Sequence, residues 1–239
     1  MTHTEFWTSS PDRIVQGSGT CTITILEPPF DVSATELPPH DPVRARRFAE
    51  EFPTVDAVLG ELPDRPAGES PYLETRADLE LIRVGCWGNV TAISDPAFVD
   101  NGNDEPLLAL TEELHQRYPH ARIVGRAEVD CGEAHTEDVI RLPGGLLFHA
   151  SGWPTMDPWK LTGDPRAVVE ALGIPDDVLA DLDLDLDEEP EDVEWKALVA
   201  LGLGQADPWL WRHLDTSVFR VRHTEAYTLT MEELWFIGG

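Results

Sequence analysis

Short β-prone runs follow one another in groups along this chain, and this grouping constrains the fold more than any other feature of the sequence. Residues 79–85 and 89–94 are two such runs around Cys86-Trp87-Gly88, a loop whose Gly tolerates positive φ, and they predict a hairpin. Runs at 121–129, 136–142 and 145–150 predict a three-stranded meander. Because helical segments separate these groups, we expect an α+β fold with a mainly antiparallel sheet, built from hairpins with helices packed on it.

Pairs of an acidic residue and a proline mark the expected helix starts. Asp41-Pro42 and Asp164-Pro165 each offer an N-cap followed by proline at the first helical position. A third helix is expected after Pro106, and a fourth over residues 193–203. We also expect a short helix from Thr54 to residue 62, capped by Thr54, and a loop over residues 62–75.

The chain is predicted to form a single domain over residues 1–239, with an acidic loop at about 181–192. No long low-complexity linker divides it, and no run of 18 apolar residues could span a membrane. The first twelve residues are polar and do not form a signal peptide. Three cysteines without a CxxC pair indicate reduced thiols, so we expect a cytosolic, cytoplasmic protein.

Acidic side chains greatly outnumber basic ones. The chain has 45 Asp and Glu against 17 Lys and Arg, a formal net charge of -28. Such a charge repels nucleic acid and anionic lipid, so we expect neither as a partner. Any partner guided by charge would be basic, and a basic protein is the partner class that the composition favours.

The acidity is densest between Asp176 and Glu194, where eleven acidic residues occur with no basic one. The spacing from Asp183 to Glu194 partly matches a calcium loop, but position six is Glu188 instead of glycine, so we predict a solvated loop without a specific cation site. The predicted partner-binding residues are all in this stretch: Asp183, Asp185, Asp187, Glu188 and Glu189.

The meander carries the densest set of residues that could take part in catalysis or metal binding. They are Asp130, Cys131, Glu133, His135, Glu137, Asp138 and His149. An imidazole oriented by a carboxylate could act as a general base, which makes His135, Asp138 and His149 the catalytic candidates. Cys131, His135 and His149 lack the close pairing of two ligands that zinc sites have, so we predict no metal and no cofactor.

The register of the hairpin at Pro143 decides whether these candidates meet. A two-residue loop would place Asp138 opposite His149, whereas a three-residue loop would place Val139 there. Proline at the first loop position and Gly145 at a positive-φ position favour the three-residue loop. In that register His149 faces away from Asp138, and His135 is expected to lie alone in the loop before the strand.

Other recognisable chemistry is missing from the sequence. No GxSxG, GxxxxGK or complete dinucleotide fingerprint occurs. Eight tryptophans are present, several beside Pro or Gly, and we expect most of them in the core, although loop tryptophans can also contact a partner.

Five stretches together resemble an uncharacterised actinobacterial family, of the Streptomyces type, known by a domain-of-unknown-function label. They are 83–90 (Arg-Val-Gly-Cys-Trp-Gly-Asn-Val), 93–96 (Ile-Ser-Asp-Pro), 135–143 (His-Thr-Glu-Asp-Val-Ile-Arg-Leu-Pro), 162–166 (Thr-Gly-Asp-Pro-Arg) and 217–223 (Ser-Val-Phe-Arg-Val-Arg-His). The resemblance covers nearly the whole chain and implies a bacterial, cytosolic, single-domain protein. It implies no activity and no site residues.

Two functions follow as expectations. The first is an acidic binding protein that neutralises or sequesters a basic protein partner, as immunity and inhibitor proteins do. The alternative is an enzyme with a His/carboxylate site around the 130–149 hairpin, with or without a divalent metal ion.

Overall fold

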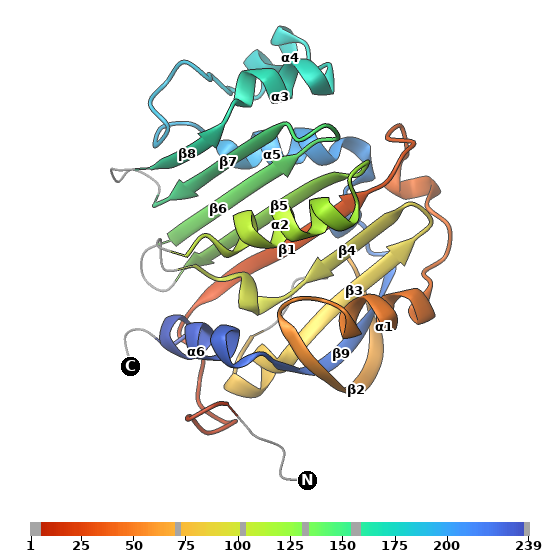
Figure 1. The fold of residues 1–239 in the computed structure, drawn as a ribbon, viewed down its shortest axis with the longest axis vertical. Helices are drawn as coiled ribbons and strands as arrows, with labels where there is room; N and C mark the ends of the chain where they lie inside the picture. Colours follow the sequence, from red (N-terminus) through yellow and green to blue (C-terminus); the bar gives the residue numbers. More distant parts are fainter. Residues whose placement is uncertain (1–5, 70–72, 101–103, 131–133, 154–158, 237–239) are drawn as a thin grey trace.

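A single antiparallel sheet of nine strands organises the computed structural model, which describes residues 6–69, 73–100, 104–130, 134–153 and 159–236 (Figure 1). The strands are β1 (Ser18–Leu26), β2 (Val55–Pro66), β3 (Leu81–Trp87), β4 (Val90–Ser94), β5 (Arg122–Asp130), β6 (Ala134–Arg141), β7 (Leu147–Gly152), β8 (Lys160–Gly163) and β9 (Asp215–His223). Their order across the sheet is β2-β9-β3-β4-β1-β5-β6-β7-β8. The expected α+β class with a mainly antiparallel sheet is therefore confirmed.

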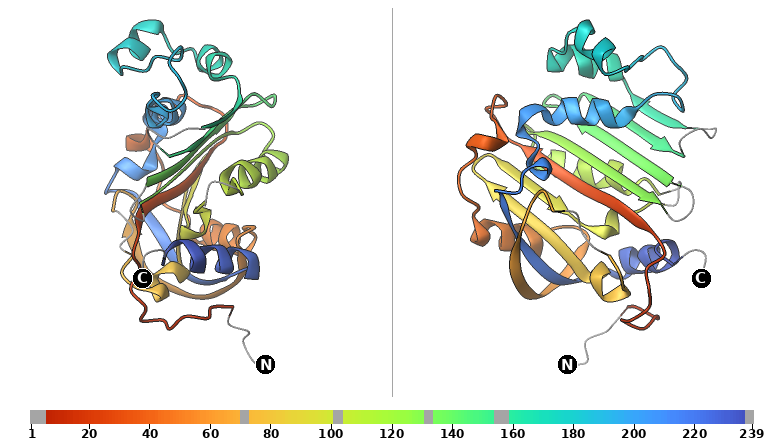
Figure 2. Two further views of the ribbon diagram at one scale, coloured as in Figure 1. Left: turned by 90° about the vertical axis from the view of Figure 1, so that its left-hand side faces the viewer. Right: turned by 180° about the vertical axis from the view of Figure 1, so that it is seen from behind.

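Helices cover both faces of this sheet (Figure 2). The α-helices of the described residues are α1 (Pro42–Glu50), α2 (Pro106–Arg117), α3 (Pro165–Leu172), α4 (Asp176–Asp181), α5 (Trp195–Leu203) and α6 (Glu225–Leu234). Helices α1, α2 and α6 pack on one face, here called the front, around β1 residues such as Ile23 and Ile25. Helix α5 packs on the opposite, back face against β5, β6 and β7. None of the described helices is long and apolar enough to cross a bilayer.

Helix ends follow the capping rules that the sequence predicts. The Asp41 carboxylate accepts hydrogen bonds from the amides of Val43 and Arg44, and Pro42 is the first residue of α1. The Asp164 carboxylate caps α3 in the same way, and Gly173, at a φ of 68°, ends that helix. Glycine is the residue that adopts this left-handed conformation at no steric cost, so the end of α3 is fixed locally.

The helix expected from Thr54 to residue 62 is wrong. The start of the loop expected over residues 62–75 is wrong as well, because the strand continues to Pro66. Both regions belong to β2, an edge strand that pairs with β9 and with no other strand of the described residues. Three register shifts interrupt the β2–β9 pairing, so the strand lacks the regular alternation that identifies a half-buried strand from sequence. Strand β8 and helix α6 were not among the expected elements either.

A buried polar network ties three strands together beneath α6. The Thr54 hydroxyl donates to Asp95 Oδ2 at 2.5 Å, and His223 Nε2 lies 3.0 Å from Asp95 Oδ1. All three side chains are fully buried. Buried polar groups are stable only when hydrogen-bonded, so this network fixes the start of β2 and the end of β9 on the end of β4.

The acidic segment, residues 181–192, crosses from α4 towards α5 without regular structure. Of its leucines, Leu184 is buried in the back-face core and Leu182 is exposed. No strand forms over residues 182–192, which make an irregular connection.

Candidate functional site

The β6–β7 hairpin has the register favoured by the sequence. Val139 pairs with His149, and the loop contains Pro143, Gly144 and Gly145, with both glycines at positive φ. Asp138 pairs with Ala150. Because neighbouring residues of a strand point to opposite faces, His135 and His149 lie on the front of the sheet, whereas Asp138 lies on the back. The structure therefore separates Asp138 from the two histidines.

His149 belongs to a hydrogen-bonded group that holds the start of α2. Its Nε2 lies 3.2 Å from Glu137 Oε1, and both side chains are fully buried. The Glu137 carboxylate also accepts the amide hydrogens of Leu107 and Leu108, at 3.1 and 2.9 Å. Burial raises the pKa of Glu137, while His149 and the two amides oppose this rise. Glu137 thus serves as a tertiary cap for α2, and this arrangement keeps His149 away from solvent.

His135 does not lie alone in a loop, and that expectation is wrong. It is part of β6 and is buried. Its ring and that of Trp153 meet edge-on, with the two ring centroids 4.6 Å apart. Ser151 Oγ lies 3.4 Å from its Nε2, and Asp100 Oδ2 lies 3.9 Å from the same nitrogen. Burial lowers the pKa of His135, and Asp100 opposes that shift. His135 directly precedes the strand that the sequence predicts over residues 136–142, so extending that strand by one residue would have included it.

This front-face cluster lacks one requirement of a catalytic triad. In a triad the hydroxyl and the carboxylate contact different ring nitrogens, so that the carboxylate orients the imidazole that activates the hydroxyl. In this protein both Ser151 and Asp100 approach Nε2. Among the described residues, no group of three His, Cys, Asp or Glu side chains is placed to hold a metal ion. Cys131 and Glu133, which belong to the predicted set, lie outside the described residues.

A groove on the back face is the larger candidate site. It has a volume of about 250 Å³ and lies between the end of β5, the start of β6 and the start of α5. Five carboxylates line it against two cationic side chains: Glu128, Asp138, Glu191, Asp192 and Glu194, with Arg126 and Lys196. Trp159 and Trp195 complete its walls. We call this cavity the acidic groove.

Both cationic side chains of the acidic groove already have carboxylate partners. Arg126 pairs with Glu128, and the Lys196 ammonium lies 2.8 Å from Glu194. The tryptophans are held by their indole N–H groups, which donate to the carbonyls of Trp153 and Pro190. The groove thus has rigid aromatic walls and an excess of negative charge.

Asp138 lines the acidic groove from β6. The residue is 2% exposed, and its Oδ1 has no hydrogen-bond partner among the described residues. Arg126 Nη1 is 3.8 Å away, which is too far for a hydrogen bond. Burial raises the pKa of Asp138 to about 7, although the charge of Arg126 opposes this rise. A cation entering the groove would meet a carboxylate whose charge is only partly compensated.

The predicted partner-binding carboxylates are exposed on the acidic segment, which directly precedes the groove residues 191–196 in the sequence. Asp183, Asp185, Asp187, Glu188 and Glu189 are all exposed. Asp187 forms an ion pair with Arg166, and its amide donates to Asp185 Oδ1 at 2.9 Å. The sequence did not indicate Arg126, Trp159 and Trp195 as a group. Strand pairing brings Arg126 to Asp138, whereas Trp159 precedes β8 and Trp195 begins α5, so only tertiary packing brings the three to one groove.

The comparison with protein families places almost the whole of this chain in one group. Residues 6–238 match a family described as a family of unknown function, DUF6333. The chain belongs to the DUF6333 family. No curated protein and no solved structure matches it. What this DUF6333 member can bind therefore follows from its geometry and charge.

Proposed function

We propose that the protein binds a basic protein partner and thereby neutralises or sequesters it. In this proposal one lysine or arginine side chain of the partner occupies the acidic groove, and the surrounding basic surface faces the acidic segment. A cytosolic location and an actinobacterial source, both expected from the sequence, belong to the same proposal.

The acidic groove is the observation that supports this proposal most. A lysine or arginine inserted there would stack against Trp159 or Trp195 and approach Asp138. Interface hot spots are enriched in such pockets, where an aromatic wall excludes water from a charged contact. The groove is concave and negative, so it suits the end of a cationic side chain better than an anion or an apolar group.

Long-range charge supports the same assignment. A net charge of -28 attracts a basic protein from a distance of about one Debye length, ~8 Å at physiological ionic strength. Such steering raises association rates and penalises acidic competitors. Leu184 anchors the exposed carboxylates of the acidic segment to the core, which lowers the entropy lost when a partner binds.

Calorimetric titration with a lysine- and arginine-rich peptide tests the proposal. We expect the wild type to bind the peptide at low ionic strength and to lose most of this affinity at high ionic strength. Neutralising Asp183, Asp185, Asp187, Glu188 and Glu189 together should weaken binding roughly tenfold or more. Asp138→Asn should weaken it as well and remove the increase in affinity between pH 6 and pH 8, a window around the pKa of Asp138 of about 7.

A matched control separates a local site from general surface charge. Five exposed carboxylates on other elements give the same change in net charge when neutralised: Asp12, Glu36, Asp64, Glu113 and Asp215. This control should keep most of the wild-type affinity. An equal loss of peptide affinity in the two variants with five substitutions each would contradict the proposal. So would a wild-type protein that does not bind the peptide.

The alternative, an enzyme with a His/carboxylate site, has one observation in its favour. His135, Ser151 and Asp100 approach one another beneath Trp153. Stoichiometric zinc, iron or manganese in the purified protein, lost in His135→Ala, would favour this enzyme over the binding protein. We expect the wild type and His135→Ala to have the same metal content, well below one ion per chain.

A further inference from the structure

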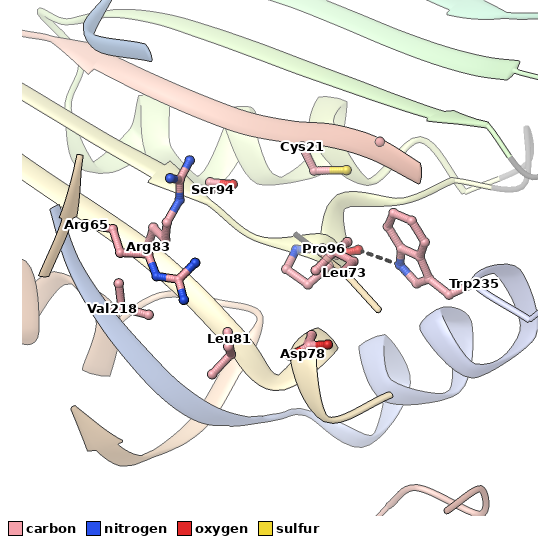
Figure 3. Close-up of a pocket in the computed structure, with 11 residues that line it drawn as sticks. Cys21, Arg65, Leu73, Asp78, Leu81, Arg83, Ser94, Pro96, Val218 and Trp235 are labelled. Carbon is pink, nitrogen blue, oxygen red and sulfur yellow. Dashed lines mark hydrogen bonds between the residues drawn. The ribbon is translucent and has the colours of Figure 1, made fainter. Parts of the chain in front are cut away.

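A second cavity lies on the back face, away from the acidic groove, where β3, β4 and β9 meet the end of β2. Its volume is about 40 Å³. Figure 3 shows the side chains of Arg65 and Arg83 at one side of it, with the guanidinium of Arg83 extending towards Ser94. Leu81, Val218 and Trp235 are among its apolar lining residues. It combines positive charge with an apolar wall, so the sign of its charge is opposite to that of the acidic groove.

Arg83 is a buried cation for which no carboxylate of the described residues lies within ion-pair distance. The residue is 7% exposed, and its Nη1 donates to the carbonyl oxygens of Pro66, at 3.4 Å, and Glu69. Its Nε is buried and has no hydrogen-bond partner among the described residues. Within the same part of the chain, no carboxylate forms an ion pair with Arg83 or with the exposed Arg65.

Two equally buried arginines of this protein show what Arg83 lacks. Arg76 Nη1 lies 2.7 Å from Glu80 Oε1, and Arg141 Nη1 lies 2.8 Å from Glu112 Oε2. Asp78 lines the cavity near Arg83, but its Oδ2 accepts the amides of Glu74 and Thr75, so it is committed to that turn. Arg83 is therefore the one buried arginine of the described residues for which no ion-pair contact with a carboxylate is found.

An unpaired buried charge costs free energy that a bound anion would recover. Burial lowers the pKa of the Arg83 guanidinium to about 10; the charge of the exposed Glu69 opposes this shift and that of Arg65 adds to it, and the group stays protonated at neutral pH. Charged donors in a dry site form strong hydrogen bonds with a carboxylate or a phosphate. The unused Nε of Arg83 leaves such a bond available.

We propose that this cavity binds the carboxylate of a small organic acid, with the carboxylate on Arg83 and the apolar body against Leu81, Val218 and Trp235. A monoanion matches the single buried guanidinium, whereas a phosphate dianion would bring a second charge into a mostly apolar cavity. A neighbouring cavity of about 160 Å³ shares Arg83 and Ser94, and its lining also includes Thr20, Thr22, Trp209 and the exposed Glu69. It offers room for an acid larger than the first cavity holds. This site is independent of the acidic groove.

Thermal shift and calorimetric titration with sodium hexanoate and sodium benzoate test the site. Both salts should raise the melting temperature with increasing concentration, because a ligand of the folded state stabilises it. Hexanol and benzamide, which keep the apolar body without the charge, should have little effect. Inorganic phosphate should bind more weakly than either carboxylate.

Arg83→Met tests the role of the guanidinium, and Arg122→Met is its control. The variant should fold, because replacing an unpaired buried charge by an apolar side chain of similar length is often neutral or stabilising. It should lose carboxylate affinity roughly tenfold or more. Arg122 is also partly buried without a carboxylate partner among the described residues, and it donates to the carbonyl of Gly202 away from this cavity, so its variant should bind like the wild type.

Arg65→Met provides a second variant that leaves the core unchanged, since Arg65 is exposed. It should weaken the binding of hexanoate by a smaller factor than Arg83→Met. Equal binding of hexanol and hexanoate, preference for phosphate over the carboxylates, or unchanged affinity in Arg83→Met would each overturn the assignment.

Discussion

At the residue scale, Asp138 shows how burial turns an ordinary acidic residue into a group with unusual properties. The same side chain on the acidic segment would be solvated, but at the floor of the acidic groove its pKa is raised to about 7. The free energy of keeping this carboxylate charged is a cost to the folded state. Functional sites often carry such local destabilisation.

We predict that Asp138→Asn stabilises the protein at pH 8 and has little effect near pH 4. The folded pKa is about 7 and the unfolded value is 3.8, so the folded state binds more protons between these values and wild-type stability falls as the pH rises through that window. The variant lacks this loss and should gain about 2–4 kcal/mol at pH 8. Urea unfolding at both pH values measures it, with the exposed Glu113→Gln as the control. A variant less stable than the wild type at pH 8 would contradict this account.

A second prediction concerns Glu137, which we assign to folding. Glu137→Ala would leave two amides of α2 and one imidazole nitrogen buried without an acceptor. It should lower the free energy of unfolding by about 3 kcal/mol or more. Glu137→Gln keeps an acceptor oxygen and should cost less. Chemical denaturation of both variants checks the order, and equal losses would show that the acceptor oxygen is not what matters.

At the scale of elements, the acidic segment is an irregular connection held mainly by Leu184. Its carboxylates are exposed, and among the described residues no three acidic or other ligand side chains are gathered around a cation position. Its partial match to a calcium loop therefore has no structural counterpart in that part of the chain.

We predict that calcium and magnesium act alike on this segment. At millimolar concentration each should shift the melting temperature slightly and by a similar amount, because screening does not depend on the identity of the ion. Asp185→Asn should not change this behaviour. Differential scanning calorimetry with each ion measures the shift. Selective stabilisation by calcium that disappears in Asp185→Asn would mean that the segment is a binding loop.

At the scale of the whole molecule, the sheet joins the two ends of the chain. Strand β9, from the last quarter of the sequence, lies between β2 and β3. Strand β1 lies at the centre and pairs with β4 and β5. A cut near Glu189 would remove β9 from between its two neighbours, so neither fragment would keep the complete sheet.

We therefore predict a single cooperative unfolding transition for the chain. Calorimetry should give one peak whose calorimetric and van't Hoff enthalpies agree. Limited proteolysis near Glu189 should not yield two stable fragments. Two separate transitions would contradict the single domain that the sequence predicts.

The sequence by itself determined the features that depend on neighbouring residues. The caps of α1 and α3, the strands of the two hairpins and the three-residue loop at Pro143 all follow from local rules. Strand β2 could not be predicted in this way, because its only strand partner is β9, about 160 residues later in the chain, and its pairing is interrupted by register shifts.

Only the tertiary structure decided which polar residues act together. Hairpin register separated Asp138 from His149, while the packing of α2 buried His149 with Glu137. The acidic groove joins strand, loop and helix residues that are distant in sequence, and the unpaired state of Arg83 is visible only once its surroundings are known. Charge and local propensity are properties of a sequence, whereas burial and partner choice arise when distant segments pack.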